Sequence, residues 1–259
     1  TMLALNVSKE VLDGFGQMFE KISDANLRID ESNNLLFENI VVNAAEKGGK
    51  WVGHERTAKQ IKEESDAFYN KIEEIKTKIT VKQKIKDPEL KKFAEMDKGE
   101  ALDVIWFKEG SDSASDEFLS MVEEYRGHVI KVFGSQYPSS IEMVEARFFI
   151  GDMNRNIKNK DNIDEPWLAA NYKGFPLISS LAKLTMMQND IRQTEHDVLT
   201  TLMGKELKMS STVNESNYTS LLITEKGAYY QGETFDGSVI LGRKGGAQNP
   251  NSVKLKIKK

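Results

Sequence analysis

The sequence contains no cysteine, so it can form no disulfide, no thiolate nucleophile and no cysteine-based zinc site. It also lacks a run of about 20 apolar residues, the length that a helix needs to span a bilayer. Charged residues of both signs are interspersed and the net charge is only −4, which argues against nucleic acid as a partner. A chain of 259 residues can nevertheless bury a substantial core, and we expect two domains.

An apolar stripe with alternating steps of three and four residues is the most informative pattern in the chain. Such spacing keeps one face of an α-helix turned toward a partner helix. It predicts a helix from Leu5 to Ile40, about 54 Å long at about 1.5 Å per residue. The apolar start at Met2 lacks an N-cap, so we expect this helix to continue a longer one. The candidate positions for helix-seam and dimer packing are Leu5, Leu12, Phe15, Phe19, Ile22, Asn26, Ile29, Asn33, Leu36 and Ile40.

Two members of this stripe, Asn26 and Asn33, are polar. A buried asparagine at such a position costs stability, but it can fix register by pairing with its equivalent across a symmetric interface. In the other interpretation, both asparagines pack within their own bundle beside a polar layer. The sequence leaves these two interpretations open.

A second stripe of the same spacing follows a short glycine turn at Gly48 and Gly49. Two long helices joined by such a turn form an antiparallel hairpin. The second stripe therefore supplies a partner for the first within the same chain. Its members are Trp51, Ala58, Ile61, Phe68, Ile72, Ile75 and Ile79.

The following region is less regular, and further helices are expected there. Asp116 is a candidate N-cap for a helix that ends at Gly134, and Pro138 opens a short helix. The last helix begins near Pro176 and runs to about Gly204. Two further segments are not expected to be helical by their pattern: 103–107 has the apolar density of a short strand or a buried turn, and its type stays open, whereas 151–165 is predicted to be a surface loop.

From about residue 210 the periodicity changes from helical to strand-like. Tyr218–Thr224 and the alternating run Val253–Lys258 are the clearest strand candidates. About 50 residues are too few for a complete β-sandwich, so we expect the chain to stop inside a β-domain. The predicted fold class is α+β multidomain: an elongated all-α helical bundle over 1–209, a linker over 210–217 and a truncated β-sandwich-like domain over 218–259.

No catalytic motif stands out, and we predict neither enzymatic activity nor a cofactor or metal. His54, His128 and His196 fall on three separate predicted helices and at no metal-ligand spacing, so structural or solvated roles are expected. Glu195, His196 and Asp197 are consecutive, and consecutive residues do not share a helix face. Three aromatic residues beside irregular segments belong either to the core or to a groove: Trp106, Phe107 and Trp167.

Three stretches of the chain, in order, resemble the GldM/PorM family. Residues 2–12 are similar to the segment where the family's transmembrane helix emerges into the periplasm. Residues 172–195, with YKGFP at the start and QNDI further on, resemble the last helix of the family's first periplasmic domain. Residues 228–243 are similar to the opening strands of its second domain. No single motif is diagnostic, and the ordered set carries the resemblance.

The resemblance implies a non-enzymatic, homodimeric periplasmic shaft of the type IX secretion and gliding machinery, anchored in the inner membrane. In this family the shaft carries motion, derived from the proton gradient, from the inner-membrane protein GldL toward GldK and GldN at the outer membrane. The membrane helix and the remaining β-domains would lie outside this chain, and with them the contacts to GldL, GldK and GldN. The alternative is a periplasmic sensory or ligand-binding helical domain, which the lack of a convincing concave polar site disfavours.

Overall fold

The computed structural model describes residues 8–82, 93–108, 112–210, 218–224 and 237–243. The chain divides into two compact units, Thr1–Leu202 and Met203–Lys259. Leu5 and the run 253–258 lie outside the described residues, so the predictions made for them stay predictions. None of the described helices combines the length and the apolar character that crossing a bilayer requires.

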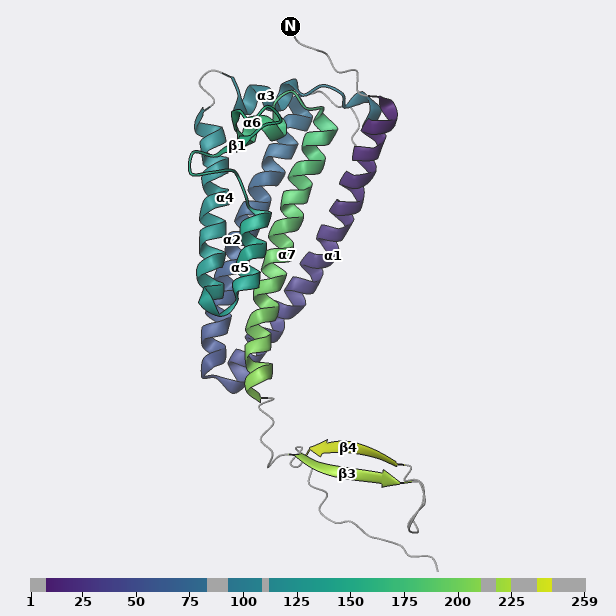
Figure 1. The fold of residues 1–259 in the computed structure, drawn as a ribbon, viewed down its shortest axis with the longest axis vertical. Helices are drawn as coiled ribbons and strands as arrows, with labels where there is room; N and C mark the ends of the chain where they lie inside the picture. Colours follow the sequence, from purple (N-terminus) through teal and green to yellow (C-terminus); the bar gives the residue numbers. More distant parts are fainter. Residues whose placement is uncertain (1–7, 83–92, 109–111, 211–217, 225–236, 244–259) are drawn as a thin grey trace, which may run out of the picture. The chain divides into compact units, whose positions relative to one another are not determined.

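Unit 1 is an elongated bundle of helices that lie side by side lengthwise (Figure 1). The short helices α3 and α6 lie at the end of the bundle where α1 and α7 begin. The elongated helical bundle predicted from the sequence is therefore confirmed. Its long helices are α1 (Lys9–Lys47), α2 (Lys50–Lys82), α4 (Asp112–Phe133) and α7 (Leu177–Ser210), and its shorter helices are η2 (Phe93–Glu95), α3 (Glu100–Trp106), η3 (Gly134–Gln136), α5 (Pro138–Arg147) and α6 (Trp167–Tyr172).

Helix α1 begins at Lys9, after an N-cap formed by Ser8. Ser8 has an extended backbone, with φ −64° and ψ 151°, and its Oγ accepts a hydrogen bond from the Val11 N–H at 3.4 Å. The side chain thereby satisfies one of the amide groups left unpaired at a helix start. The prediction that one helix runs without a break from Leu5 is therefore wrong at Ser8.

The predicted hairpin of α1 and α2 is confirmed. Helix α1 ends at Lys47, and the turn places Gly48 and Gly49 at φ 60° and 58°, a left-handed region that glycine enters without a steric penalty. The Gly48 N–H also donates to the Ala44 carbonyl oxygen at 3.0 Å, which caps the last turn. All members of the second stripe except the half-buried Trp51 are buried.

Residues 103–106 are helical, which corrects the expectation of a strand or turn. They belong to α3, where burial of Trp106 decides the conformation: its ring lies 4.9 Å from Phe118 and 5.2 Å from Tyr172. Asp116 is likewise no N-cap, because α4 already begins at Asp112. Asp116 instead contacts the Arg155 guanidinium at 3.2 Å. Gly134, at φ 62°, ends α4 as predicted.

The predicted surface loop over 151–165 contains a small hairpin instead. Strand β1 (Asn156–Lys158) pairs in antiparallel fashion with β2 (Asp164–Pro166). The guanidinium of Arg155 binds Glu123 of α4 through Nε at 3.2 Å and a second nitrogen at 2.7 Å. This two-point contact fastens the hairpin to α4, and sequence periodicity could not reveal such a long-range contact.

The core of unit 1 contains an aromatic cluster. The ring of Phe68 on α2 lies 5.6 Å from Tyr125 on α4 and 6.5 Å from Phe148 at the end of α5. Tyr125 and Phe148 in turn meet edge to face at 5.3 Å. Offset and edge-on contacts of this kind stabilise a core beyond the burial of apolar area.

In unit 2, strand β3 (Tyr218–Thr224) pairs with β4 (Gly237–Arg243). The pair is antiparallel, with Tyr218 opposite Arg243 and Thr224 opposite Gly237. The change from helix to strand predicted near residue 210 is confirmed for these two strands. A complete or truncated β-sandwich is not seen in the described residues, and that part of the predicted fold class stays a prediction.

Candidate functional site

The predicted seam of α1 is divided into two rows. The inner row consists of every seventh residue and is directed into the bundle, with four of its members at most 1% exposed and Phe19 half-buried. The outer row is half-buried throughout, at the edge of the helix. The inner row is Leu12, Phe19, Asn26, Asn33 and Ile40, and the outer row is Phe15, Ile22, Ile29 and Leu36.

The two asparagines of the inner row bind α7 in the same way, one heptad apart. The Asn26 amide donates to the Thr185 carbonyl oxygen at 3.3 Å, and its own oxygen accepts from the Asn189 amide at 2.9 Å. The Asn33 amide donates to the Arg192 carbonyl oxygen at 3.0 Å, and its oxygen lies 3.0 Å from His196 Nδ1.

This repeat answers the question that the sequence left open for Asn26 and Asn33. A step of seven residues on α1 matches a step of seven on α7, so the two helices run parallel and in register. Each asparagine satisfies its amide inside its own chain, as in the interpretation that placed it in a polar layer of the bundle. The inner row is therefore occupied by contacts within one protomer, and the outer row is left as the candidate surface for a second copy.

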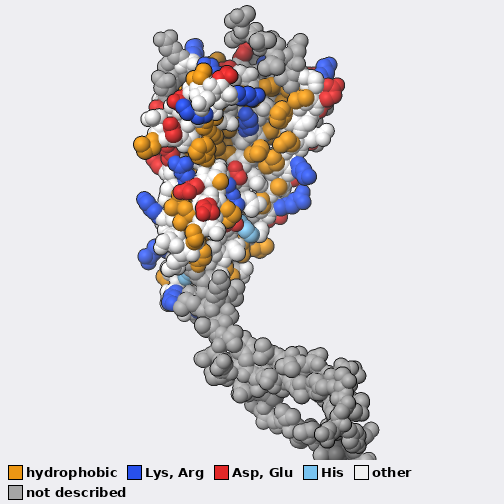
Figure 2. All heavy atoms as spheres, viewed as in Figure 1, with side chains coloured by type: hydrophobic (Ala, Val, Ile, Leu, Met, Phe, Trp, Pro, Cys, Tyr) orange, Lys and Arg blue, Asp and Glu red, His pale blue; other side chains and the backbone are white. Residues whose placement is uncertain are grey.

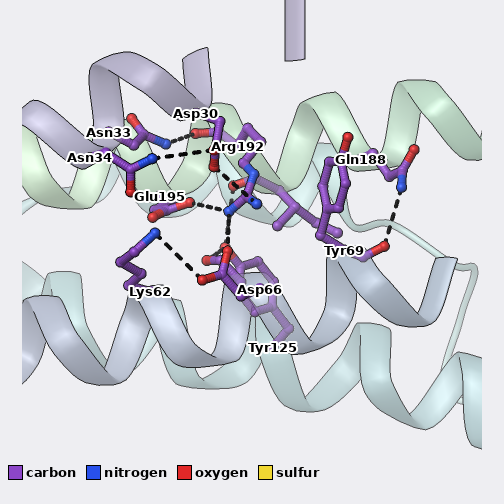
Figure 3. Close-up of polar contacts among 12 residues, drawn as sticks. Asp30, Asn33, Asn34, Lys62, Asp66, Tyr69, Tyr125, Gln188, Arg192 and Glu195 are labelled. Carbon is purple, nitrogen blue, oxygen red and sulfur yellow. Dashed lines mark hydrogen bonds and ion pairs between the residues drawn. The ribbon is translucent and has the colours of Figure 1, made fainter. Parts of the chain in front are cut away.

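Beside Asn33, the buried side chain of Arg192 joins three helices through charge (Figure 3). One guanidinium nitrogen lies 3.0 Å from Asp30 of α1, and the other lies 2.7 Å from Asp66 of α2 and 2.8 Å from Glu195 of α7. Lys62 approaches Asp66 at 3.4 Å. We call these five residues the Arg192 junction. Since arginine offers several donors in a fixed plane, it can bind carboxylates from different helices at once.

Glu195 is the fully buried member of the Arg192 junction. One carboxyl oxygen, Oε2, accepts from Arg192, whereas Oε1 has no hydrogen-bond partner among the described residues. Burial raises the pKa of Glu195, and the nearby Arg192 opposes that rise only in part. The site thus favours the neutral form of this carboxyl group more than water does.

A second polar cluster lies one heptad earlier on α7. The Lys76 ammonium of α2 donates to Glu73 at 2.8 Å and to the Gln188 side chain at 2.9 Å, and lies 5.4 Å from the Phe19 ring. Gln188 in turn donates to the Tyr69 carbonyl oxygen at 3.2 Å. These contacts pair the buried ammonium and connect α2 to both α7 and α1.

A pocket of about 320 Å³ adjoins this cluster. Phe19 of α1, Val81 of α2, Phe93 of η2 and Leu181 of α7 supply apolar walls, and the Lys76 side chain supplies a polar one. Apolar walls with a few convergent polar groups are typical of small-molecule sites.

The remaining candidate residues belong to the packing of the bundle. His128 contacts Glu64, and Glu195, His196 and Asp197 have separate partners, as predicted: Arg192, Asn33 and Arg147. Within the described ranges, no three histidine, aspartate or glutamate side chains are grouped as a metal site requires. Trp106 is buried, so it belongs to the core, whereas Phe107 and Trp167 are half-buried.

A protein-family model described as the GldM N-terminal domain matches residues 10–205. The chain belongs to the GldM family. The matched range covers most of the chain and nearly all of unit 1, with the asparagine contacts and the Arg192 junction inside it. A comparison with curated proteins gave no match. Members of the GldM family are components of gliding motility and type IX secretion, are associated with the cell envelope and belong to no known enzyme class.

The sequence did not point to the Arg192 junction. Its members lie on three helices, α1, α2 and α7, that are far apart in the sequence. A charged residue at a core-facing position is a signal in principle, but α7 has polar residues around much of its circumference. Only the packing of the three helices singles out Arg192 and Glu195.

Proposed function

We propose that this chain is part of a non-enzymatic periplasmic shaft of the gliding and type IX secretion motor. The shaft takes up motion at the inner membrane, where GldL is its partner, and passes it toward GldK and GldN at the outer membrane. Family membership supports the machinery, and the helical contacts of unit 1 support the mechanical role.

The coupling of α1 to α7 is the observation that carries the proposal. Helix α1 is 39 residues long and is fastened to α7 at Asn26, at Asn33 and through Asp30 and Arg192. Helix α7 is also the element whose chain continues beyond unit 1. A displacement of α1 would therefore be passed directly to the helix that leads into the following segment.

The shaft is proposed to be a homodimer in which α1 supplies the contact surface. Beside its outer row, α1 exposes Val11 and Met18, which are 49% and 45% exposed. Hydrophobic side chains gather over α1 and α7 on the face shown in Figure 2. An apolar strip of this kind on a soluble helix is typical of a surface that packs against another protein.

The mechanical role is tested by breaking α1 at an exposed position. Leu35 is 62% exposed, so Leu35→Pro removes a helical hydrogen bond and kinks α1 without removing a core side chain. In cells that carry the full-length protein, we expect Leu35→Pro to abolish gliding and secretion, and Leu35→Ala to leave both intact. Normal secretion by an accumulated Leu35→Pro protein with a dimeric, folded periplasmic part would contradict the shaft role.

The pocket beside Phe19 favours a second candidate, a sensory or ligand-binding domain. Thr77 lines this pocket and is exposed, so Thr77→Trp fills the space from outside with little disturbance of the core. A sensory domain would lose its response in this variant, whereas a shaft would keep secreting. Normal gliding and secretion by Thr77→Trp would therefore exclude the sensory function.

A further inference from the structure

The charges of the Arg192 junction do not balance when every group is ionised. Arg192 and Lys62 carry two positive charges, and Asp30, Asp66 and Glu195 carry three negative ones. An uncompensated charge is unfavourable inside a protein, and buried groups commonly change their protonation state instead. Binding one proton would make the junction neutral.

Glu195 is the group that can hold this proton. Its side chain is 0% exposed, whereas the side chains of Asp30 and Asp66 are 34% and 37% exposed, although the Oδ1 atom of Asp30 is buried as well. The Oε1 atom of Glu195 has no hydrogen-bond partner among the described residues. A neutral hydroxyl loses less than a charged carboxylate oxygen when it is buried without a partner. The raised pKa that burial gives Glu195 agrees with this assignment.

We propose that Glu195 is a proton-operated latch for α1. With the proton on Glu195, the Arg192 guanidinium and the Lys62 ammonium together neutralise Asp30 and Asp66, and Arg192 holds α1 against α2 and α7. When Glu195 gives its proton to water, a third negative charge competes for the same guanidinium. Asp30 then turns to solvent, and the centre of α1 separates from α7 more often.

Asp30 is the carboxylate that leaves, because the other two keep a stronger hold. Asp66 also has the Lys62 ammonium at 3.4 Å, and Glu195 is on the same helix as Arg192. Asp30 contacts Arg192 as an ion pair, and among the contacts described for it the only hydrogen bond that it accepts comes from Asn34 of its own helix, at 3.3 Å. Losing the Asp30 contact to Arg192 therefore removes a charged link between α1 and the rest of the bundle.

The other groups around Glu195 do not replace it as the titrating group. Tyr69 of α2 lies against the guanidinium at 4.6 Å, and Tyr125 of α4 is held by Ser65 at 2.8 Å. Burial raises the pKa of both phenols above the ordinary value for tyrosine, so both stay neutral from pH 5 to pH 9. Arg147 of α5 binds Asp197 and Thr194 on another face of α7.

Hydrogen exchange of the purified 259-residue chain tests the latch. The exchange rates of α1 amides between Asn26 and Asn33 are measured from pH 5 to pH 9 and corrected for the intrinsic effect of pH. Since the closed state binds the proton more tightly, opening should increase with pH. The equilibrium constant for opening should increase by about tenfold for each unit by which the pKa of Glu195 in the closed state exceeds its pKa in the open state.

Three variants separate the latch from a general effect of pH. Glu195→Gln is permanently neutral, so its α1 should stay protected and lose the pH dependence. Asp30→Asn should exchange faster at every pH, again with no pH dependence of its own. Glu123→Gln removes another carboxylate that binds an arginine, on α4, and should behave as the unchanged chain.

Two results would overturn the proposal. One is a pH dependence of α1 exchange that persists in Glu195→Gln. If that variant does not fold, the side-chain carboxyl of Glu195 is titrated by carbon NMR in the unchanged chain. A titration of Glu195 in its ordinary range would then reject the latch. The latch does not depend on the shaft role, and a failure of the shaft in cells would leave both measurements unaffected.

Discussion

The side-chain amide of Asn33 donates a hydrogen bond to the backbone carbonyl oxygen of Arg192 at 3.0 Å and so ties α1 to α7. Asn26 makes the same contact with Thr185 one heptad earlier. A heptad pattern by itself allows α1 to pack against any helix. The two asparagine contacts select α7 of the same chain as the partner. The half-buried outer row beside these contacts is the surface that we propose for a second copy.

Replacing Asn33 with alanine should lower the free energy of unfolding by about 1–3 kcal/mol. The substitution removes the side-chain amide, so the Arg192 carbonyl oxygen loses this buried donor and His196 Nδ1 loses its contact at 3.0 Å. Chemical denaturation measures the change. Asn43→Ala is the matched control, because the side chain of the half-buried Asn43 donates to the Asn39 carbonyl oxygen of the same helix, and it should change stability by less than about 0.5 kcal/mol. Equal effects of the two substitutions would contradict the role of Asn33.

Gly16 and Gly14 should respond to alanine in opposite directions. A Cβ atom on Gly16 would lie 2.0 Å from the ring of the buried Phe93, so that ring must be displaced. We expect Gly16→Ala to destabilise the chain by about 1–3 kcal/mol. A Cβ atom on Gly14 meets nothing within 4 Å, and Gly14→Ala should stabilise the helix by up to about 1 kcal/mol. Thermal unfolding of both variants checks this, and a stabilising Gly16→Ala would show that Phe93 moves away freely.

Asp190 should make stability fall as the pH rises from about 4 to about 6. Burial raises the pKa of Asp190 from 3.8 to about 6, and Arg147 offsets only part of this effect. The folded chain therefore binds a proton that the unfolded chain has already lost, so this contribution to stability is complete below about pH 4 and is lost through pH 6. It amounts to at most about 3 kcal/mol. Asp190→Asn should flatten this part of the profile, measured by urea denaturation across the range. A profile unchanged by the substitution would show that Asp190 titrates normally.

Single cysteines can map the proposed dimer surface, because the chain has none of its own. Ile22 and Ile29 belong to the outer row, so Ile22→Cys and Ile29→Cys should form disulfides between two copies under mild oxidation. Leu27 lies on another face of α1 and is 65% exposed, so Leu27→Cys should stay unlinked. Non-reducing gels report the outcome. Cross-linking that favours Leu27 would move the interface to the opposite face of α1.

Much of the fold follows from local patterns. The two stripes and the pair Gly48 and Gly49 were enough to predict the α1–α2 hairpin, because spacing and left-handed turns are local properties. The failures occurred where distant contacts decide. The segment around Trp106 is helical because its ring packs on Phe118 and Tyr172, and the hairpin after Arg155 is held by Glu123.

The candidate site shows the same division. Sequence spacing identified Asn26 and Asn33 as unusual, since a polar residue in an apolar stripe is visible without a structure. It did not identify their partners, which lie about 160 positions away on α7. It gave no sign of Glu195 as a buried acid, because carboxylates occur along every helix of this chain.

The helical hairpin, the change to strands near residue 210 and the resemblance to the GldM family can all be predicted from the amino-acid order, because they depend on local periodicity and short sequence stretches. The face of α1 that packs inside the protomer is visible only in the folded chain. That face depends on which helix lies beside α1. A heptad pattern predicts that a helix packs against another helix, but it does not identify that helix. Arg192 and Glu195 are buried for the same reason: three helices that are far apart in the sequence pack together around them.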